Sequence, residues 1–278
     1  MNDPAHKAPL IDSDALPSRP VPIDALTTTS FEYAPDTEAP VLETNGRPWN
    51  NFWTLSALAF FAVLLPGLSL IQVGDVGETL RLLGQNPIVF YVATIFLQIF
   101  ILGMVIVGVA AERANLASLG VNRFRPLYAV QGVVFLMATA VVLLALEAML
   151  SALGFPIRDE VRLLLPDTGA ERVWWFFVSL SAAVCEELAF RGFLLTRLKT
   201  ILGHLNPKLS GWTPAVIVSA IAFGVGHNYQ GVAGLVLVTI LGAGLSLLYI
   251  RTGSLWPCIV AHFLQDFLHI FVPIFDKQ

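Results

Sequence analysis

Long apolar stretches, each near the length of a helix that crosses a lipid bilayer, follow one another from residue 52 to residue 271. A hydrocarbon core about 30 Å thick is crossed by about 20 apolar residues in a helix. Only 13% of the residues are charged, whereas a soluble domain carries about 25%. The sequence therefore excludes an ordinary soluble fold and predicts an all-α, polytopic transmembrane helix bundle.

We expect about seven membrane spans, and about six to eight are compatible with the hydropathy pattern. The fifth is short and is followed by glycines, so it is a candidate to end within the membrane. Pro66 is expected to kink the first span. The seven ranges are Phe52–Val73, Ile88–Ala111, Pro126–Leu150, Val173–Leu198, Thr213–His227, Gly231–Ile250 and Leu255–Phe271.

The first 50 residues differ from the rest of the chain. They hold eight of the 17 prolines and several acidic side chains, with few apolar residues spaced to form a face. Such a segment cannot bury enough surface to offset the entropy lost on ordering. We predict a disordered, Pro-rich acidic tail over residues 1–50, N-terminal transmembrane helices over 51–155 and a transmembrane core over 156–278.

The positions of Lys and Arg predict the orientation, because cytoplasmic loops are enriched in both. With a cytoplasmic N-terminus, ten of these residues lie inside and five outside, and Arg191 lies within a span. We expect a multi-pass protein of the plasma (inner) membrane of a prokaryote, with its N-terminus in the cytoplasm. No basic patch with interleaved aromatic residues occurs, so no nucleic acid is expected as a partner.

The fourth span carries three ionisable side chains, Glu186, Glu187 and Arg191. A charged side chain at mid-membrane costs at least about 2.5–3.5 kcal/mol, so it usually marks a function or a satisfied pair. Glu187 and Arg191 are four residues apart on one helix face, which favours a salt bridge between them. Glu186 points about 100° away, which leaves its carboxylate available as a general base.

Two further spans carry histidines. His227 ends the fifth span, and His262 lies in the seventh, four residues before Asp266. Asp266 could hold one imidazole nitrogen of His262 or act directly. At 1.5 Å per residue, the depths of Glu186, His227 and His262 overlap, so the three helices are expected to meet in one polar pocket nearer the cytoplasmic side.

The order and spacing of these residues resemble the three motifs of the CAAX prenyl protease and bacteriocin-processing family, also called the Abi family. The resemblance covers about residues 170–270, so the segment 156–278 is identified as a transmembrane catalytic core of the CAAX-protease type. The three motifs are Glu186-Glu187-x-x-x-Arg191, Phe223-x-x-x-His227 and His262-x-x-x-Asp266.

The resemblance implies an intramembrane endopeptidase that hydrolyses a peptide bond. In this reading Glu186 activates a water molecule, and Glu187 supports it while pairing with Arg191 as structural support. His227 positions the water or stabilises charge.

His262 and Asp266 complete the implied catalytic set, in which they bind the developing oxyanion or protonate the leaving amine. The family commonly has asparagine where this chain has Asp266. An asparagine can donate a hydrogen bond to an oxyanion, whereas an ionised aspartate cannot. Orientation of His262, or metal binding, is therefore more plausible for Asp266 than a direct oxyanion contact.

Family members have been described both as metalloproteases and as metal-independent glutamate proteases. No His-Glu-x-x-His spacing is present, and we slightly favour a glutamate-activated water with no required cofactor. A divalent metal such as zinc stays an open alternative, with Glu186, His227 and His262 as its ligands.

Two other functions are alternatives. A family member without hydrolytic activity would act as a membrane scaffold or immunity factor. Intramembrane Glu, His and Arg also build proton relays, so the other alternative is a proton-coupled transporter, although no internal repeat of the kind common in transporters is visible. The expected partners are the lipid bilayer and a peptide or protein substrate, prenylated or not, reached from the membrane or the cytoplasm. The oligomeric state stays open.

Overall fold

The computed structural model describes residues 50–71 and 75–271, and within these ranges it contains helices and no strand. The predicted end of the first span at Val73 lies outside the described residues, as does the predicted tail apart from Asn50. The helices, in chain order, are α1 (Phe52–Ala59), η3 (Phe60–Leu64), α2 (Leu65–Leu70), α3 (Val76–Gly84), α4 (Pro87–Ala111), η4 (Leu116–Leu119), α5 (Pro126–Ala152), η5 (Asp159–Leu164), α6 (Gly169–Glu186), η6 (Glu187–Leu195), α7 (Thr196–Leu205), η7 (Pro207–Leu209), α8 (Trp212–Gly226), η8 (Asn228–Gln230), α9 (Gly231–Thr252), α10 (Trp256–Phe267) and η9 (Leu268–Phe271).

Five helical stretches of the described chain are long and apolar enough to cross a membrane. The predicted fifth and seventh spans correspond to α8, with 15 residues, and α10, with 12. At 1.5 Å per residue these helices are about 22 Å and 18 Å long, and η9 extends the seventh stretch by about 8 Å at 2.0 Å per residue. Neither stretch reaches across a core of about 30 Å alone. The five longer stretches are Phe52–Leu70, Pro87–Ala111, Pro126–Ala152, Gly169–Leu205 and Asn228–Thr252.

Large apolar side chains cover much of the outer surface of these helices. Phe96 on α4 is 68% exposed and Val141 on α5 is 70% exposed. Such a surface is unfavourable in water, where patches of this kind mark contact with another apolar phase. Together with the five long apolar helices, it identifies an integral membrane protein.

The helix boundaries follow local signals in the sequence. Thr168 and Glu171 form a capping box at the start of α6, in which each side chain accepts a hydrogen bond from the other residue's backbone N–H. Pro126 begins α5, where its missing N–H costs no intrahelical bond. Gly253 ends α9 in the left-handed conformation with a φ of 62°, which favours glycine. The helix that carries the ionisable cluster therefore has a well-defined start.

Two of the long helices contain a π-helical segment where the sequence predicted a continuous α-helix. Glu187–Leu195 forms η6 between α6 and α7, and Phe60–Leu64 forms η3 just before Pro66. Pro66 has no N–H to offer to the preceding turn, which accounts for the wider turn there. The segment η6 begins at Glu187, and π-helical turns occur frequently at functional sites.

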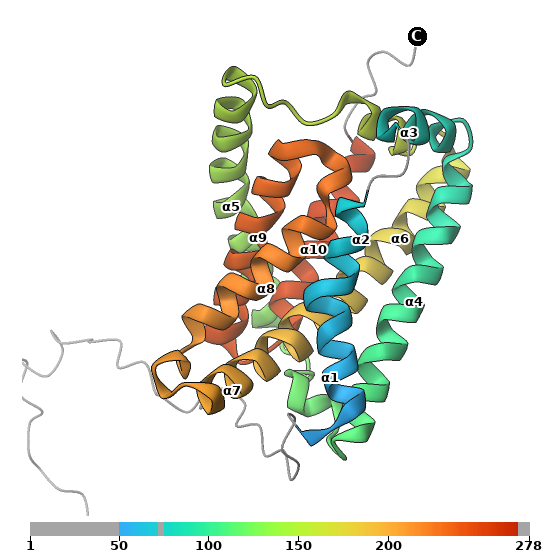
Figure 1. Cartoon of the computed structure of the whole chain (residues 1–278). Helices are drawn as coiled ribbons and strands as arrows, with labels where there is room; N and C mark the ends of the chain where they lie inside the picture. Colours follow the sequence, from blue (N-terminus) through green and yellow to red (C-terminus); the bar gives the residue numbers. More distant parts are fainter. Residues whose placement is uncertain (1–49, 72–74, 272–278) are drawn as a thin grey trace, which may run out of the picture. The chain divides into compact units, whose positions relative to one another are not determined.

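Helix α10 packs against α5, α6 and α9, while α4 packs against α6, and α8 lies along α9 (Figure 1). The contact between α5 and α10 is close because Gly132 has no side chain. A Cβ atom on Gly132 would lie 2.7 Å from the backbone oxygen of Pro257. This packing brings the polar face of α10 against the junction of α6 and η6, where Glu186 and Glu187 lie.

The short helix α3 was not predicted. The side chain of Asp75 caps its first turn, and Arg81 forms an ion pair of 2.7 Å with Glu160 of η5. Leu80 is buried on its inner side. Helix α3 lies in the connection between the first and second spans, and it covers one end of the long helices (Figure 1).

Candidate active site

A fully buried ion pair lies at the start of η6. The Nη1 atom of Arg191 donates to Oε1 of Glu187 at 2.8 Å, and the two side chains are 1% and 0% exposed. The Nη2 atom of Arg191 also donates to the backbone oxygen of Gly242 at 3.3 Å, and its guanidinium lies 4.2 Å from the centre of the Phe223 ring. The predicted salt bridge is present, and it compensates the charge of Glu187.

His262 reaches this pair from α10. Its Nδ1 atom lies 2.8 Å from Oε1 of Glu187, so Nδ1 carries the proton and donates to the carboxylate. On the other side of the ring, Nε2 lies 3.5 Å from Oδ2 of Asp266 and 3.9 Å from Oε2 of Glu186. Glu187, and not Asp266, therefore makes the close contact that orients the imidazole.

Glu186 has a different environment from its neighbour. Its side chain is 12% exposed, and its Oε1 atom accepts a hydrogen bond of 2.6 Å from Nε2 of Gln98. Its Oε2 atom is buried and has no hydrogen-bond partner among the described residues. The gap of 3.9 Å between this oxygen and Nε2 of His262 is too long for a direct hydrogen bond. One carboxylate oxygen of Glu186 is thus held, and the other faces the imidazole.

His227 lies beside the cluster without touching its carboxylates. Its Nδ1 atom is 2.9 Å from the backbone oxygen of Phe223, which leaves Nε2 as an acceptor. The Phe223 ring centre lies 5.0 Å from His227 and 6.1 Å from His262. Within residues 50–71 and 75–271, no hydrogen bond or ion pair links His227 to Glu186, Glu187 or Asp266. The structure therefore brings five of the six predicted residues into one contact network and places His227 next to it.

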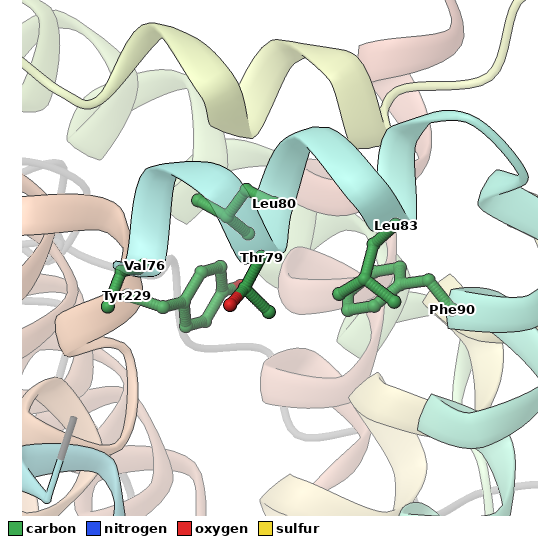
Figure 2. Close-up of a pocket in the computed structure, with 6 residues that line it drawn as sticks. All are labelled: Val76, Thr79, Leu80, Leu83, Phe90 and Tyr229. Atoms are coloured by element: carbon green, nitrogen blue, oxygen red, sulfur yellow. The ribbon is translucent and has the colours of Figure 1, made fainter. Parts of the chain in front are cut away.

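The turn after His227 leads to an apolar cavity. Tyr229 lies with its ring centre 6.1 Å from the imidazole of His227, and Gln230 donates to its hydroxyl at 3.2 Å. Figure 2 shows the ring of Tyr229 beneath α3. The ring lines an apolar cavity of about 260 Å³. The other lining residues are Val76, Thr79, Leu80, Leu83 and Phe90. The cavity adjoins the His227 turn and is not lined by the carboxylates.

Two polar features of this region were missed in the sequence. Gln98 contacts Glu186 from α4, a helix that has no motif residue. Arg197, near the end of the predicted fourth span, is 1% exposed and forms an ion pair of 2.7 Å with the equally buried Glu112. The insertion cost that identified Glu186 would also have identified Gln98, because an amide in an apolar span needs a partner as well.

The fit of a metal ion can be judged from the side chains. Oε1 of Glu187 accepts hydrogen bonds from both Arg191 and His262, and His227 is not in polar contact with Glu186. Among the described residues, no group of three His, Cys, Asp or Glu side chains is placed to hold a metal ion. Zinc in proteins takes three or four such ligands, so the arrangement does not fit the ligand set Glu186, His227 and His262.

Comparison with known proteins gives one result for the region of the motifs. Residues 168–268 match the family model described as Rce1-like, type II CAAX prenyl endopeptidase. Comparisons of the chain with curated proteins and with solved structures found no match. All three motifs lie inside the matched range. The resemblance seen in the motifs is therefore confirmed: over residues 168–268 the chain is similar to the Rce1-like family of type II CAAX prenyl endopeptidases.

Proposed function

We propose that the protein is an intramembrane endopeptidase that hydrolyses a peptide bond with a water molecule activated by Glu186. The observation that carries the proposal is the buried Oε2 atom of Glu186, which has no partner in the described chain and faces Nε2 of His262 at 3.9 Å. A carboxylate oxygen and an imidazole nitrogen across such a gap can share one water or one reacting carbonyl group. The family match over residues 168–268 supports the same activity.

In the proposed reaction, Oε2 of Glu186 takes a proton from water while the water oxygen attacks the carbonyl carbon of the scissile bond. The carbonyl oxygen becomes an oxyanion, which the protonated Nε2 of His262 stabilises as a hydrogen-bond donor. The intermediate collapses when Glu186 returns its proton to the leaving nitrogen. The carbon–nitrogen bond then breaks, and the products are a carboxylic acid and an amine.

The remaining residues of the site support Glu186 and His262. Glu187 accepts from Nδ1 of His262 and so orients the ring, while Arg191 compensates the charge of Glu187. Asp266 lies 3.5 Å from Nε2 of His262, on the side of the ring that also faces Glu186. His227 keeps Nε2 available to position the attacking water from the side of Phe223. Buried carboxylates are thus balanced by one arginine and one histidine.

We propose as substrate a membrane-associated protein or peptide, prenylated or not, that enters from the membrane or the cytoplasm. The apolar cavity beside Tyr229 offers a place for an apolar group of that substrate close to His227. The bilayer itself is the second partner, because large apolar side chains cover the outer surface of the helices. No nucleic acid is expected.

We further propose that the protein lies in the plasma membrane of a prokaryote with a cytoplasmic N-terminus, as the Lys and Arg distribution favours. Both natural cysteines, Cys185 and Cys258, are buried, so a single introduced cysteine can report the orientation. Asn50→Cys should react with a membrane-impermeant maleimide in inverted vesicles and not in intact cells. Labelling in intact cells would reverse the orientation.

The central test follows cleavage of a panel of quenched fluorescent peptides, prenylated and not, by protein purified in detergent. We expect Glu186→Gln and His262→Ala to lower kcat by about 10²–10⁴-fold. Glu147→Gln is the matched control, because Glu147 is also a glutamate of a membrane-spanning helix but lies in α5. A cooperative thermal unfolding transition in each variant shows that the variant is folded.

The outcomes separate the proposed function from its alternatives. Loss of cleavage in both site variants, with activity kept in Glu147→Gln, supports the protease. Cleavage that survives Glu186→Gln would contradict the assigned base. Folded protein that cleaves no peptide of the panel, but moves protons across liposomes in a way that needs Glu186, would favour the transporter.

A further inference from the structure

Gln98 is the one side-chain amide in a span that is otherwise free of charged and amide groups. Helix α4, Pro87–Ala111, contains no Asp, Glu, Lys, Arg, His or Asn. Gln98 lies near its middle and is 3% exposed. A buried amide costs free energy unless its hydrogen-bonding groups find partners. A glutamine at this position therefore calls for a specific partner.

Gln98 occupies the face of α4 that packs against α6. Apart from the adjacent Gly108 and Val109, the buried residues of α4 follow one another at intervals of three, four or seven, which is the pattern of one helix face. This pattern places Gln98 at a position where an apolar residue would pack as well. The buried residues are Pro87, Tyr91, Gln98, Ile101, Val105, Gly108 and Val109.

The partner of Gln98 is the carboxylate of Glu186. Nε2 of Gln98 lies 2.6 Å from Oε1 of Glu186, a distance typical of a hydrogen bond strengthened by the charge of its acceptor. With the amide reversed, its oxygen would face a carboxylate oxygen at the same distance, and two acceptors repel each other. The amide nitrogen is therefore the atom that faces Glu186.

We propose that Gln98 is a positioning residue for hydrolysis: its amide binds Oε1 of Glu186 and so directs the other oxygen, Oε2, towards Nε2 of His262. The proposal rests on the proposed role of Glu186 as the base. Gln98 lies outside the range 168–268 that matches the family. The N-terminal helices then contribute to the reaction as well as to the membrane anchor.

The test compares Gln98→Met, which keeps the length of the side chain but removes the donor, with wild type. Gln131→Met is the matched control, because Gln131 lies in another membrane-spanning helix, α5, and also has an amide oxygen without a partner, but no hydrogen bond joins it to a motif residue of the described chain. We expect Gln98→Met to lower kcat by about 10- to 100-fold with KM changed by less than about 2-fold. Its unfolding temperature should stay close to that of wild type, because loss of the hydrogen bond to Glu186 is offset by removal of the buried amide oxygen, which has no hydrogen-bond partner in the described chain. Gln131→Met should keep wild-type kcat.

Two additional variants separate positioning from packing. Gln98→Glu keeps the volume but places a carboxylate against Glu186, so its kcat should fall at least as far as that of Gln98→Met. In the background of Glu186→Gln, Gln98→Met should cause no further loss, because residues that act as a unit are not additive.

The outcomes distinguish a failure of this inference from a failure of the proposed function. If Glu186→Gln abolishes cleavage but Gln98→Met keeps wild-type kcat, the positioning role of Gln98 is wrong and the assignment of Glu186 as the base is retained. If Gln98→Met lowers kcat only in proportion to a lower unfolding temperature, Gln98 is a packing residue. If Glu186→Gln keeps its activity, the base itself is wrong and the role of Gln98 falls with it.

Discussion

Glu187 and His262, 75 residues apart in the chain, are joined by a hydrogen bond of 2.8 Å between Oε1 and Nδ1. The same oxygen accepts a hydrogen bond of 2.8 Å from Nη1 of Arg191. One carboxylate oxygen therefore orients the imidazole and compensates a buried cation. The neighbouring Glu186, which takes part in neither contact, keeps an oxygen for the reaction.

Replacement of Glu187 should reduce both stability and activity. Glu187→Ala leaves Arg191 as a buried cation without its ion-pair partner, and breaking a buried pair costs about 3–5 kcal/mol. Thermal unfolding in detergent measures the loss. The control is Arg81→Gln at the pair with Glu160, where Arg81 is 63% exposed and about 0–1 kcal/mol is expected. Equal unfolding temperatures for the two variants would contradict the structural role of Glu187.

The ion pair between Glu112 and Arg197 should act on stability alone. Arg197 donates to Glu112 at 2.7 Å and stacks 4.8 Å from the Phe193 ring centre, and no hydrogen bond or ion pair joins it to a motif side chain of the described chain. Glu112→Ala should cost about 3–5 kcal/mol, while kcat per folded molecule stays at the wild-type value. Glu112→Leu combined with Arg197→Met should recover most of the stability, because apolar replacement of both partners is often neutral. A lower kcat in this folded double variant would connect the pair to catalysis.

The membrane class and the register of the polar residues could be predicted because both depend on local pattern. Apolar runs of about 20 residues predict spans, and a spacing of four predicts that Glu187 meets Arg191 and that His262 lies near Asp266. Both contacts are present. The predicted α5, from residue 126 to 150, ends at Ala152, a difference within ordinary helix fraying.

Features that depend on tertiary packing could not be predicted in the same way. The composition of Glu187–Leu195 does not distinguish a π-helix from an α-helix, because the hydrogen-bond register of this segment is set by the helices packed around it. The contact between Glu187 and His262 requires their two helices to be aligned in depth. A sequence gives helix boundaries only to within a few residues, so it does not fix this alignment. Helix α3 is different, because Val76, Leu80 and Leu83 have helical spacing and could have predicted it.

A methyl group on Gly224 should disturb the end of α8. A Cβ atom there would lie 1.8 Å from Oγ1 of Thr239 and 2.7 Å from the backbone oxygen of Leu235, so α8 and α9 would have to separate. We expect Gly224→Ala to cost about 1–3 kcal/mol and to lower kcat, because His227 follows three residues later. Gly226→Ala is the control, since nothing lies within 4 Å of its Cβ position. Similar unfolding temperatures and rates for the two variants would refute the close contact.

Asp266→Asn should keep most of the activity. The side chain of Asp266 lies 3.5 Å from Nε2 of His262 and is 34% exposed, and an asparagine oxygen can accept from the same nitrogen. An asparagine amide can in addition donate to an oxyanion. We expect kcat of Asp266→Asn within about 10-fold of wild type and that of Asp266→Ala lower by about 10²-fold. If both variants lose activity equally, the negative charge of Asp266 is needed for the reaction.

Removal of divalent metals should leave cleavage intact. Oε1 of Glu186 is engaged by Gln98, and Oε1 of Glu187 and Nδ1 of His262 are engaged by each other, which leaves Oε2 of Glu186 and the Nε2 atoms of the two histidines as possible ligands. A zinc site needs ligands at about 2.0–2.3 Å around one centre, and in the described chain no group of three His, Cys, Asp or Glu side chains is placed to supply them. Protein dialysed against a zinc chelator should therefore cleave the best peptide of the panel at the wild-type rate. Loss of activity that added zinc restores would show that the cluster rearranges around a metal, with His227 turning inward to complete it.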